Sequence, residues 1–560
     1  MNRTEYPRPT FRRSHWMTLN GEWQFGAGTE PSFDRQIVVP FCAESELSGV
    51  HELPGDVVWY RRRFDAPAAD RLLLHFGAVD YRATVWVNDV EVARHEGGHV
   101  PFTADITGMS LARDNHLVIR AEDPLTDKTI PRGKQYWGPK PEGIFYTPTT
   151  GIWQSVWVEP LPERHITGIR VNPDLAQGAV AFEVGGEGNI ELVARLDGEV
   201  VGTWSGPPGP GRMQLDAVAL WSPESPRLYD LEIRLLGSGR AETDRADTYF
   251  GMRQIETREG QFLLNGEPYV QRLVLDQGYF PGGLMTAARD EELRRDIELA
   301  KAFGFNGARK HQKGEDPRWL YWADRLGFLV WSEMPSFHEH SPEAERRLAA
   351  EWSELVRRDR DHPSIVAWVV ANESFGLDHI DPAVRARFLD ELYHRTHTLD
   401  GTRPVISNDG WEHALSDLCT VHDYSPPAEL ARRYRNIDAA LDGGAGGHAA
   451  YGPGYGHRGE PVMVSECGGL RIAGSGGWGW LEVPDGDAFI GVYGALIDGL
   501  MDAGPVVGFC YTQLADVEQE QNGLLTAGRV PKVDAALLRP HTQAPKRAPN
   551  PILDRSPDPS

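Results

Sequence analysis

The sequence predicts a multidomain β and α/β protein in which two β-sandwiches precede a C-terminal (β/α)8 barrel. Short strand-like segments separated by Gly, Asn and Asp turns fill the first 250 residues or so. From about residue 269 onward, apolar runs alternate with amphipathic segments that have Leu and Ala at helical spacing. The chain has 560 residues, which is enough for three domains that each bury a core.

Eight apolar runs in the second half of the chain have the length and the β-branched character of buried parallel strands. They are Tyr269–Leu275, Phe305–Arg309, Gly327–Trp331, Ile365–Ala371, Pro404–Ser407, Cys419–His422, Pro461–Ser465 and Val507–Tyr511. Helical segments such as 290–303 and 343–361 lie between them. Eight strand–helix units over roughly 270 residues match a (β/α)8 barrel in number and length.

Glu373 and Glu466 end the fourth and the seventh of these runs. In a (β/α)8 barrel the C-terminal ends of the strands form the catalytic face, so we expect both carboxylates in one pocket. A single strand-end Glu is about as often a structural acceptor, but a pair facing a common pocket is what glycosidic bond cleavage requires. Polar residues that end the other runs outline the same pocket: Asp276, Gln277, Arg309, His311, Glu333, Asn372, Asn408, Asp409, His422, Asp423, Tyr424, Gln513 and Asp516.

The first half of the chain divides into two sandwiches. Strand-like segments up to about residue 160 predict the first, with Asn88-Asp89 as a hairpin turn. A second set over about 165–252 fits an immunoglobulin-like sandwich. Both are interpreted as scaffold. The loop 132–146 is the exception, because it is long, rich in Lys, Trp and Tyr, and able to reach over the barrel mouth.

Composition excludes several classes of partner. The formal net charge of −24 argues against nucleic acid and anionic membrane surfaces. No apolar stretch approaches the roughly 18 residues needed to span a bilayer, and the first residues show no apolar signal region. The four cysteines are too few for a disulfide framework and lack zinc-ligand spacing. We therefore expect a cytoplasmic protein with reduced thiols and with neither a metal nor another cofactor.

Several motifs resemble glycoside hydrolase family 2, the family of β-galactosidase and β-glucuronidase. They are Leu19–Phe25, Thr150–Trp157, Phe250–Arg253, Ala323–Glu333, Asp361–Trp368 with Asn372-Glu373, and Val464–Glu466. The resemblance covers nearly the whole chain. It implies a jelly-roll domain over 1–161, an immunoglobulin-like sandwich over 162–252 and a catalytic TIM barrel over 253–539. Residues 540–560, rich in Pro and charge, are predicted to be a disordered tail.

The same resemblance implies roles for the pocket residues. Glu373 matches the family's acid/base and Glu466 its nucleophile. Tyr424 matches a tyrosine that steadies the nucleophile, and we expect Arg309 to keep that carboxylate ionised. Asn372 is placed to bond the sugar 2-hydroxyl.

Further sugar contacts are expected from His311, Glu333, His422, Asp276, Asp516 and the aromatic residues Trp411, Trp478 and Trp480. Two positions depart from the family pattern. After the second strand the histidine, His311, stands one residue early, and Gln312 occupies the position where the family has histidine. After the nucleophile, Cys467 replaces an aromatic residue. Both changes affect the pocket that recognises the sugar, and therefore the identity of the substrate. The Gly- and His-rich segment 442–457 is interpreted as a mobile rim loop.

The sequence predicts a retaining exo-glycosidase for a neutral sugar, with β-galactosides first. A uronate would be repelled by the acids Asp276, Glu333 and Asp516 unless Lys532 or Arg529 were brought in to pair with it. Glucuronides, arabinosides and galactofuranosides stay open as alternatives, as does an inactive carbohydrate-binding protein. The expected partner is a small carbohydrate or glycoside, with no nucleic acid and no membrane; a homo-oligomer is left open.

Overall fold

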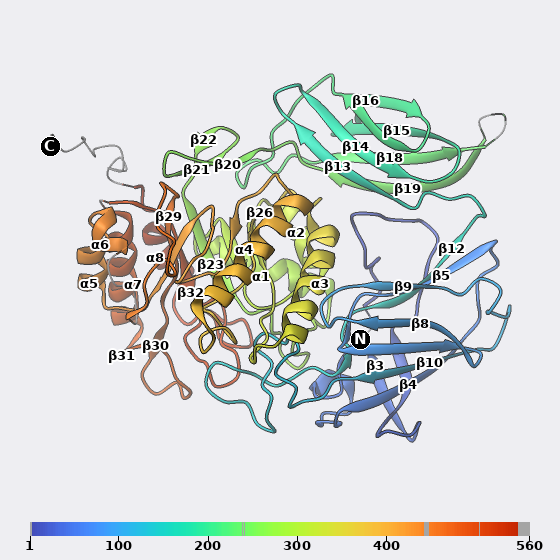
Figure 1. Cartoon of the computed structure of the whole chain (residues 1–560), viewed down its shortest axis with the longest axis horizontal. Helices are drawn as coiled ribbons and strands as arrows, with labels where there is room; N and C mark the ends of the chain where they lie inside the picture. Colours follow the sequence, from blue (N-terminus) through green and yellow to red (C-terminus); the bar gives the residue numbers. More distant parts are fainter. Residues whose placement is uncertain (1–2, 238, 240, 442–446, 503, 547–560) are drawn as a thin grey trace.

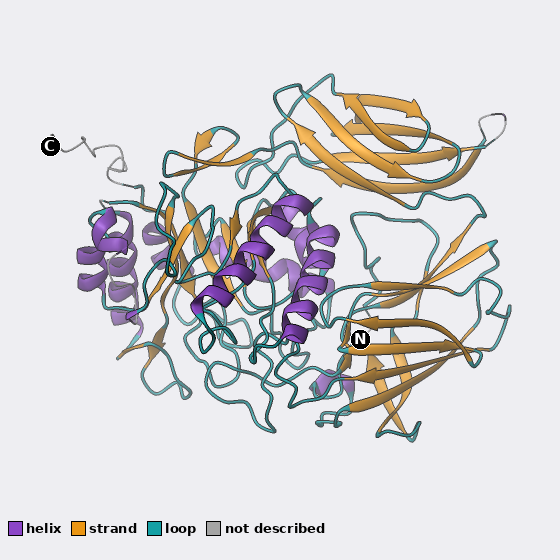
Figure 2. Ribbon diagram, viewed as in Figure 1, coloured by secondary structure: helices purple, strands orange, loops and turns teal. Residues whose placement is uncertain are grey.

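The computed structural model describes residues 3–237, 239, 241–441, 447–502 and 504–546. Two β-sandwiches lie on one side of an α/β barrel, at the right of Figure 1, and the helices cover the outside of the barrel strands in Figure 2. The fold class predicted from the sequence is therefore confirmed.

The N-terminal sandwich packs a six-stranded sheet, in the order β3-β2-β4-β10-β7-β8, against a four-stranded sheet, in the order β1-β12-β5-β9. A short pair, β6 and β11, completes it. Its strands and single 3-10 turn are β1 (Met17–Thr18), β2 (Gly21–Ala27), β3 (Arg35–Val39), η1 (Glu46–Ser48), β4 (Val57–Phe64), β5 (Arg71–Phe76), β6 (Val79–Asp80), β7 (Arg82–Val87), β8 (Val90–Glu96), β9 (Phe102–Asp105), β10 (Asn115–Glu122), β11 (Gly151–Ile152) and β12 (Val156–Leu161).

Local sequence explains these antiparallel strands. Side chains of β10 alternate between buried and half-buried positions, as expected for a sheet with one face on the core. The hairpin between β7 and β8 turns at Asn88 and Asp89, whose φ angles are 49° and 64°. Both residues adopt the left-handed conformation that a two-residue hairpin needs, so the predicted turn is confirmed.

The second sandwich packs the sheets β13-β14-β17 and β16-β15-β18-β19 against each other. A small three-stranded ribbon then leads into the barrel. The strands of these two parts are β13 (Gly168–Asp174), β14 (Ala179–Gly185), β15 (Asn189–Leu196), β16 (Glu199–Gly206), β17 (Gly209–Gln214), β18 (Tyr229–Leu236), β19 (Glu242–Phe250), β20 (Ile255–Arg258), β21 (Gln261–Leu264) and β22 (Glu267–Pro268).

All eight predicted barrel strands form, and they pair in parallel in the order β27-β26-β25-β24-β23-β32-β29-β28. They are β23 (Gln271–Asp276), β24 (Gly307–Lys310), β25 (Leu329–Glu333), β26 (Ile365–Val369), β27 (Val405–Ile406), β28 (Cys419–Asp423), β29 (Val462–Gly468) and β32 (Val506–Thr512). Every residue of β26 is buried, because the barrel interior covers one face and helices cover the other. β27 and β28 stand at the two ends of the sheet, and the bond from Gly410 N to Thr420 Oγ1 helps to span the gap.

Eight helices of the described chain pack outside the barrel strands. They are α1 (Asp290–Ala302), α2 (Pro317–Leu326), α3 (Pro342–Asp359), α4 (Pro382–Leu399), α5 (Pro427–Arg433), α6 (Ile437–Leu441), α7 (Gly486–Met501) and α8 (Ala535–Thr542). The two short strands β30 (Leu470–Ile472) and β31 (Leu481–Val483) lie between β29 and α7. A loop, rather than a helix, joins β27 to β28.

The end of the chain corrects one predicted boundary. The tail was expected to begin at residue 540, but α8 continues through Pro540 to Thr542, where Thr542 Oγ1 and Tyr493 Oη are 2.7 Å apart. Residues 547–560 lie outside the described residues. All four cysteines are buried and free. None of the helices described is long and apolar enough to cross a membrane.

Candidate active site

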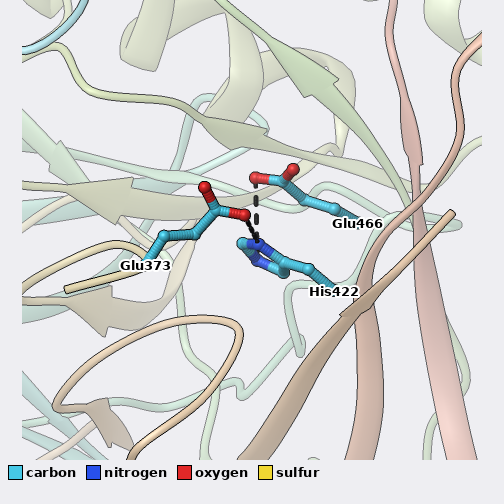
Figure 3. A group of neighbouring side chains, drawn as sticks. All are labelled: Glu373, His422 and Glu466. Atoms are coloured by element: carbon cyan, nitrogen blue, oxygen red, sulfur yellow. Dashed lines mark hydrogen bonds and ion pairs between the residues drawn. The ribbon is translucent and has the colours of Figure 1, made fainter. Parts of the chain in front are cut away.

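Glu373 and Glu466 lie together at the C-terminal end of the barrel strands, with His422 between them (Figure 3). Glu373 follows β26, Glu466 belongs to β29 and His422 to β28. One oxygen of each glutamate and one ring nitrogen of His422 all lie within 4.8 Å of one another. The structure thus brings together the two carboxylates that the sequence singled out, from strands that are not neighbours in the chain.

The surroundings of Glu466 favour its ionised form. Its Oε1 accepts a hydrogen bond from Arg309 Nη1 at 2.6 Å, and its Oε2 accepts one from the Tyr424 hydroxyl at 2.5 Å. Burial by itself raises the pKa of Glu466, but the positive charges of His422 and Arg309 outweigh it and lower the pKa to about 2. Glu466 is therefore an anion over the physiological range.

His422 is a cation in this site. Burial lowers the pKa of His422, but the charges of Glu466 and Asp409 outweigh burial and raise the pKa to about 10. Both ring nitrogens then donate: Nδ1 to Glu373 Oε1 at 2.7 Å, and Nε2 to Asp409 Oδ2 at 3.1 Å. Nε2 also lies 3.6 Å from Glu466 Oε1. A single imidazolium therefore contacts both glutamates.

The backbone at Glu373 is held in an uncommon conformation. Glu373 and Ser374 have φ angles of 49° and 54°, in the left-handed region that residues other than glycine seldom adopt. Hydrogen bonds from Glu373 N to Asp409 O and from Ser374 N to Asn408 Oδ1 fix this turn. Such strain is found where a site needs one side-chain direction, and here it directs Glu373 toward His422.

Arg309 organises the floor of the site. Its guanidinium, fully buried, lies 2.7 Å from Glu333 Oε2 and 2.9 Å from Asp409 Oδ2 through Nε. Its Nη2 donates to Asn372 Oδ1 at 2.6 Å, which orients the Asn372 amide. With Glu466 these contacts engage all three guanidinium nitrogens, so we assign Arg309 to positioning the groups around it.

Glu373, His422 and Glu466 are spaced closely enough to hold a metal ion. Whether they could bind one depends on the protonation and hydrogen bonds of their ligand atoms. A ligating imidazole needs a free lone pair, and an imidazolium that donates from both nitrogens has none. Both oxygens of Glu466 already accept charge-assisted hydrogen bonds. These residues fit proton transfer and nucleophilic attack better than metal binding.

The loop 132–146, which we call the strap, reaches from the N-terminal sandwich over the barrel. Gly133 N donates to Ser336 O at 3.0 Å, and the Tyr146 hydroxyl donates to Glu520 Oε2 at 2.6 Å. Trp478 Nε1, on the loop after β30, donates to Gly143 O of the strap at 3.0 Å. The reach that the sequence suggested is therefore present, and the strap forms part of the pocket wall.

The pocket above the two glutamates is lined by residues of the barrel and of the strap. They are Lys134, Ile144, Leu275, Gln277, His311, Glu373, Tyr424, Glu466, Trp480, Thr512 and Glu520. His311 lies here as predicted. Burial, together with the charges of Arg309 and Lys134, lowers the pKa of His311 well below its usual value, so it is neutral.

Three acids that were expected at the sugar lie outside this lining and are paired with cations. Asp276 accepts from Lys310 Nζ at 2.7 Å, and Asp516 accepts from Lys532 Nζ at 2.6 Å. Glu333 is fully buried below the pocket, where Arg309 and Gln312 donate to its two oxygens. Each of these acids therefore already has a protein donor, and its contact with sugar stays a prediction.

Of the three predicted aromatic contacts, Trp480 lines the pocket, and its ring stacks on Tyr424 with centroids 4.2 Å apart. Trp478 does not line it. Trp411 packs edge-on against His422 at 5.6 Å and stacks on His448 at 4.3 Å, outside the lining. Of the predicted rim loop 442–457, residues 442–446 lie outside the described residues.

Of the two polar residues predicted after the first barrel strand, Gln277 lines the pocket and Asp276 does not, since successive residues at a strand end point to opposite sides. Other lining residues were missed by sequence reasoning. Thr512 ends the eighth strand and Glu520 follows it, in the region where Asp516 had been chosen. The composition of the strap was the only signal for Lys134. Asp409, at the end of the fifth strand, was noted as polar, but its bond to His422 was not foreseen.

The chain is similar to known glycoside hydrolase domains along most of its length. Three family descriptions match: "Glycosyl hydrolase 2 galactose-binding domain-like" over residues 34–142, "Glycosyl hydrolases family 2" over 165–253 and "Glycosyl hydrolases family 2, TIM barrel domain" over 255–477. Similar curated proteins include β-glucuronidases of Felis catus, 30% identical over 75% of this chain and 73% of the cat protein, and of Paenibacillus borealis, 28% identical over 84% and 85%.

The match to the Canis lupus familiaris β-glucuronidase, at 30% identity, covers 66% of this chain and 62% of the dog protein's length. Among solved structures, the β-glucuronidase of Ruminococcus gnavus in complex with D-glucuronic acid has a TM-score of 0.78 at 21% identity, covering 97% of this chain and 100% of that one. The Dictyoglomus thermophilum β-D-glucuronidase has a TM-score of 0.79 at 22% identity, over 97% and 99%. Because both structures are less than 25% identical to this chain, their similarity establishes a shared fold only.

Proposed function

Because this chain belongs to glycoside hydrolase family 2, we propose that it hydrolyses terminal β-glucuronides with retention of anomeric configuration. The observation that carries this proposal is the placement of oxygens of Glu373 and Glu466 within 4.8 Å of each other. Retaining glycosidases have carboxyl groups about 5–5.5 Å apart, whereas inverting enzymes leave about 6.5–9.5 Å for a water molecule.

The different surroundings of the two glutamates assign their roles. Glu466 is held as an anion by Arg309, Tyr424 and His422, which suits a nucleophile. Glu373 contacts only the cation His422 among these three groups, and its side chain is more exposed than that of Glu466. It is therefore the residue that can exchange a proton with substrate and water.

In the first step Glu466 attacks the anomeric carbon while Glu373 gives its proton to the glycosidic oxygen. The bond between the anomeric carbon and that oxygen breaks, the aglycone leaves as an alcohol, and a glycosyl ester forms on Glu466. Asn372, oriented by Arg309, is placed to bond the sugar 2-hydroxyl as charge develops at the anomeric carbon.

In the second step water attacks the anomeric carbon of the glycosyl ester. Glu373, now a carboxylate, takes a proton from this water, and the bond to Glu466 breaks to restore its negative charge. His422 supports both halves of the cycle, because its positive charge is adjacent to whichever glutamate is ionised. After the second step the free sugar leaves with its original anomeric configuration.

The choice of a glucuronide replaces the β-galactoside that the sequence favoured. That choice depended on repulsion between a uronate and Asp276, Glu333 and Asp516. Each of these acids is paired with a cation and lies outside the pocket lining, so its repulsion of a uronate is weakened. The curated relatives are named β-glucuronidase, which supports the glucuronide as the first substrate to test.

The test is kcat/KM of the purified protein for nitrophenyl β-glucuronide against nitrophenyl β-galactoside, with arabinoside and galactofuranoside as further substrates. We expect a preference of tenfold or more for the glucuronide. A Glu466→Ala preparation, purified in parallel, controls for contaminating glycosidases. A preference for any neutral glycoside would overturn the proposed specificity, and absence of all hydrolysis would favour a carbohydrate-binding role.

A further inference from the structure

Lys134 of the strap is fixed over the pocket by contacts with the barrel. Gly133 donates to Ser336 O at 3.0 Å and its carbonyl accepts from His338 Nε2 at 2.7 Å. A side chain at Gly133, whose φ is 57°, would meet Gln312 O at 2.3 Å, so the backbone approaches the barrel as closely as a glycine allows. The carbonyl of Lys134 itself accepts from Tyr146 N at 2.8 Å.

The ammonium of Lys134 has no acceptor within the described chain, although the residue is only 6% exposed. Its nearest ring contacts are Phe145 and Phe375, whose centroids lie 5.8 and 5.7 Å from Nζ. The other deeply buried lysines differ. Lys310 lies 2.7 Å from Asp276 and 2.6 Å from Glu315, and Lys313 donates to two backbone carbonyls.

The Lys134 stem is buried, but Nζ opens to the pocket, so an anion from outside the protein can reach the ammonium and supply the acceptor that the protein does not. Glu520 lines the same pocket, but its two oxygens already accept from the Tyr146 hydroxyl and Asn522 Nδ2. The charge of Lys134 opposes the rise that burial causes in the pKa of Glu520, but no hydrogen bond joins the two side chains in the described chain.

The cations that follow the eighth strand are committed elsewhere. Lys532 Nζ donates to Asp516 and to Gln521 O, at 2.6 and 3.0 Å. Arg529 binds both oxygens of Asp296, at 3.0 and 2.9 Å. Neither residue lines the pocket. Among the lining residues of the described chain, Lys134 is the one lysine or arginine, and its ammonium forms no hydrogen bond or ion pair with the protein.

We propose that Lys134 binds the carboxylate of the uronic acid ring, so that the N-terminal sandwich, through its strap, supplies the cation that selects an acidic sugar. This inference rests on the proposed glucuronide specificity and assigns the residue that produces it. The ammonium and the C6 carboxylate form a charge-assisted hydrogen bond in a pocket largely closed to water, where such a bond is strongest.

The test compares nitrophenyl β-glucuronide with nitrophenyl β-glucoside, which differ only in having a carboxylate or a hydroxymethyl group at C6. In Lys134→Met, which keeps the apolar stem, kcat/KM for the glucuronide should fall at least about thirtyfold relative to that for the glucoside. Lys134→Arg should retain part of the preference. Lys140→Met is the matched control, because Lys140 is exposed on the same strap, and its ratio should equal that of the wild type.

The outcomes separate this inference from the function on which it rests. A wild-type enzyme that prefers glucuronides, with an unchanged ratio in Lys134→Met, would overturn the role of Lys134 and leave the function standing. Equal losses on both substrates would also overturn it, since Lys134 would then act by positioning Glu520 or the strap. A wild-type enzyme that prefers the glucoside would overturn both.

A measurement on the wild-type protein keeps the inference testable if the variant does not fold. The amines are labelled by reductive methylation, and peptide mass spectrometry follows modification of Lys134 and Lys140. Saturating D-glucuronate should slow labelling of Lys134, whereas D-glucose should not, and Lys140 should be indifferent to both. Equal labelling of Lys134 with either sugar would overturn the proposed contact.

Discussion

His422 Nδ1 lies 2.7 Å from Glu373 Oε1, and Nε2 of the same ring lies 3.6 Å from Glu466 Oε1. One positive charge therefore contacts both carboxylates of the proposed mechanism. When Glu466 becomes an ester in the first step and loses its charge, His422 is left with Glu373 and Asp409 as anionic neighbours. The titrations of these groups are consequently linked, so a change in the charge of one group shifts the pKa of the others.

The two glutamates should fail in different ways when truncated. Glu466→Ala should abolish hydrolysis of every glycoside, because no covalent intermediate can form. Glu373→Ala should retain much of the first step on dinitrophenyl glycosides, whose leaving group needs no proton, and azide should rescue its second step as a glycosyl azide. Steady-state rates with and without azide measure this. Equal loss in both variants on the activated substrate would mean that the roles are reversed or shared.

Hydrolysis should proceed with retention. The separation of the two carboxylates leaves no room for a water molecule between nucleophile and anomeric carbon, so two inversions are expected. Proton NMR recorded during the first minutes of hydrolysis reports the anomer released before mutarotation. Initial release of the α-anomer from a β-glycoside would contradict the double-displacement mechanism.

Tyr424→Phe should slow the enzyme without abolishing it. The variant loses the 2.5 Å hydrogen bond to Glu466 Oε2, while the bond from Arg309 to Oε1 is kept. A hydrogen bond to a charged group contributes about 1.5–3 kcal/mol, which corresponds to a fall of about 10- to 150-fold in kcat/KM. The acidic limb of the pH–rate profile should also move to higher pH, because Glu466 has lost a donor. An unchanged profile would show that Tyr424 only packs against Trp480.

His422 should make stability depend on pH in the alkaline range. Its pKa is about 10 in the folded protein against 6.5 in an ordinary environment, so the folded state keeps a proton that the unfolded chain has released. The stabilisation is complete below pH 6.5 and is lost as the pH rises through about 10. Urea unfolding between pH 7 and 9.5 should show a decline steeper in the wild type than in His422→Gln, by up to about 1.4 kcal/mol per pH unit.

His413→Gln provides the matched control for that experiment. His413 is also buried on the same side of the barrel, but burial lowers its pKa, so it is neutral in both states above pH 7. Its substitution should leave the alkaline slope unchanged. Equal slopes for the wild type and His422→Gln would contradict the assignment of His422 as an imidazolium.

The sequence by itself determined the architecture and the reactive pair. Apolar runs of strand length that alternate with helical periods are typical of a parallel sheet covered by helices, their number matched a barrel, and all eight runs formed strands. Glu373 and Glu466 end two of those runs, and every parallel strand of a barrel ends at the same face. Their meeting was therefore a consequence of local pattern. The Asn88-Asp89 turn was equally local, since its conformation depends on two residues.

Only the tertiary structure decided which neighbouring groups face the sugar. Adjacent residues at a strand end point to opposite sides, so Asp276 and Gln277 could not be separated without the register of β23. Glu333 and Asp516 could be assigned only once their partners Arg309 and Lys532 were placed. Lys134 enters the pocket from another domain, through a strap whose path depends on packing against Gln312 and Ser336. Long-range packing of this kind leaves no periodic signal in a sequence, because it is set by contacts between residues far apart in the chain.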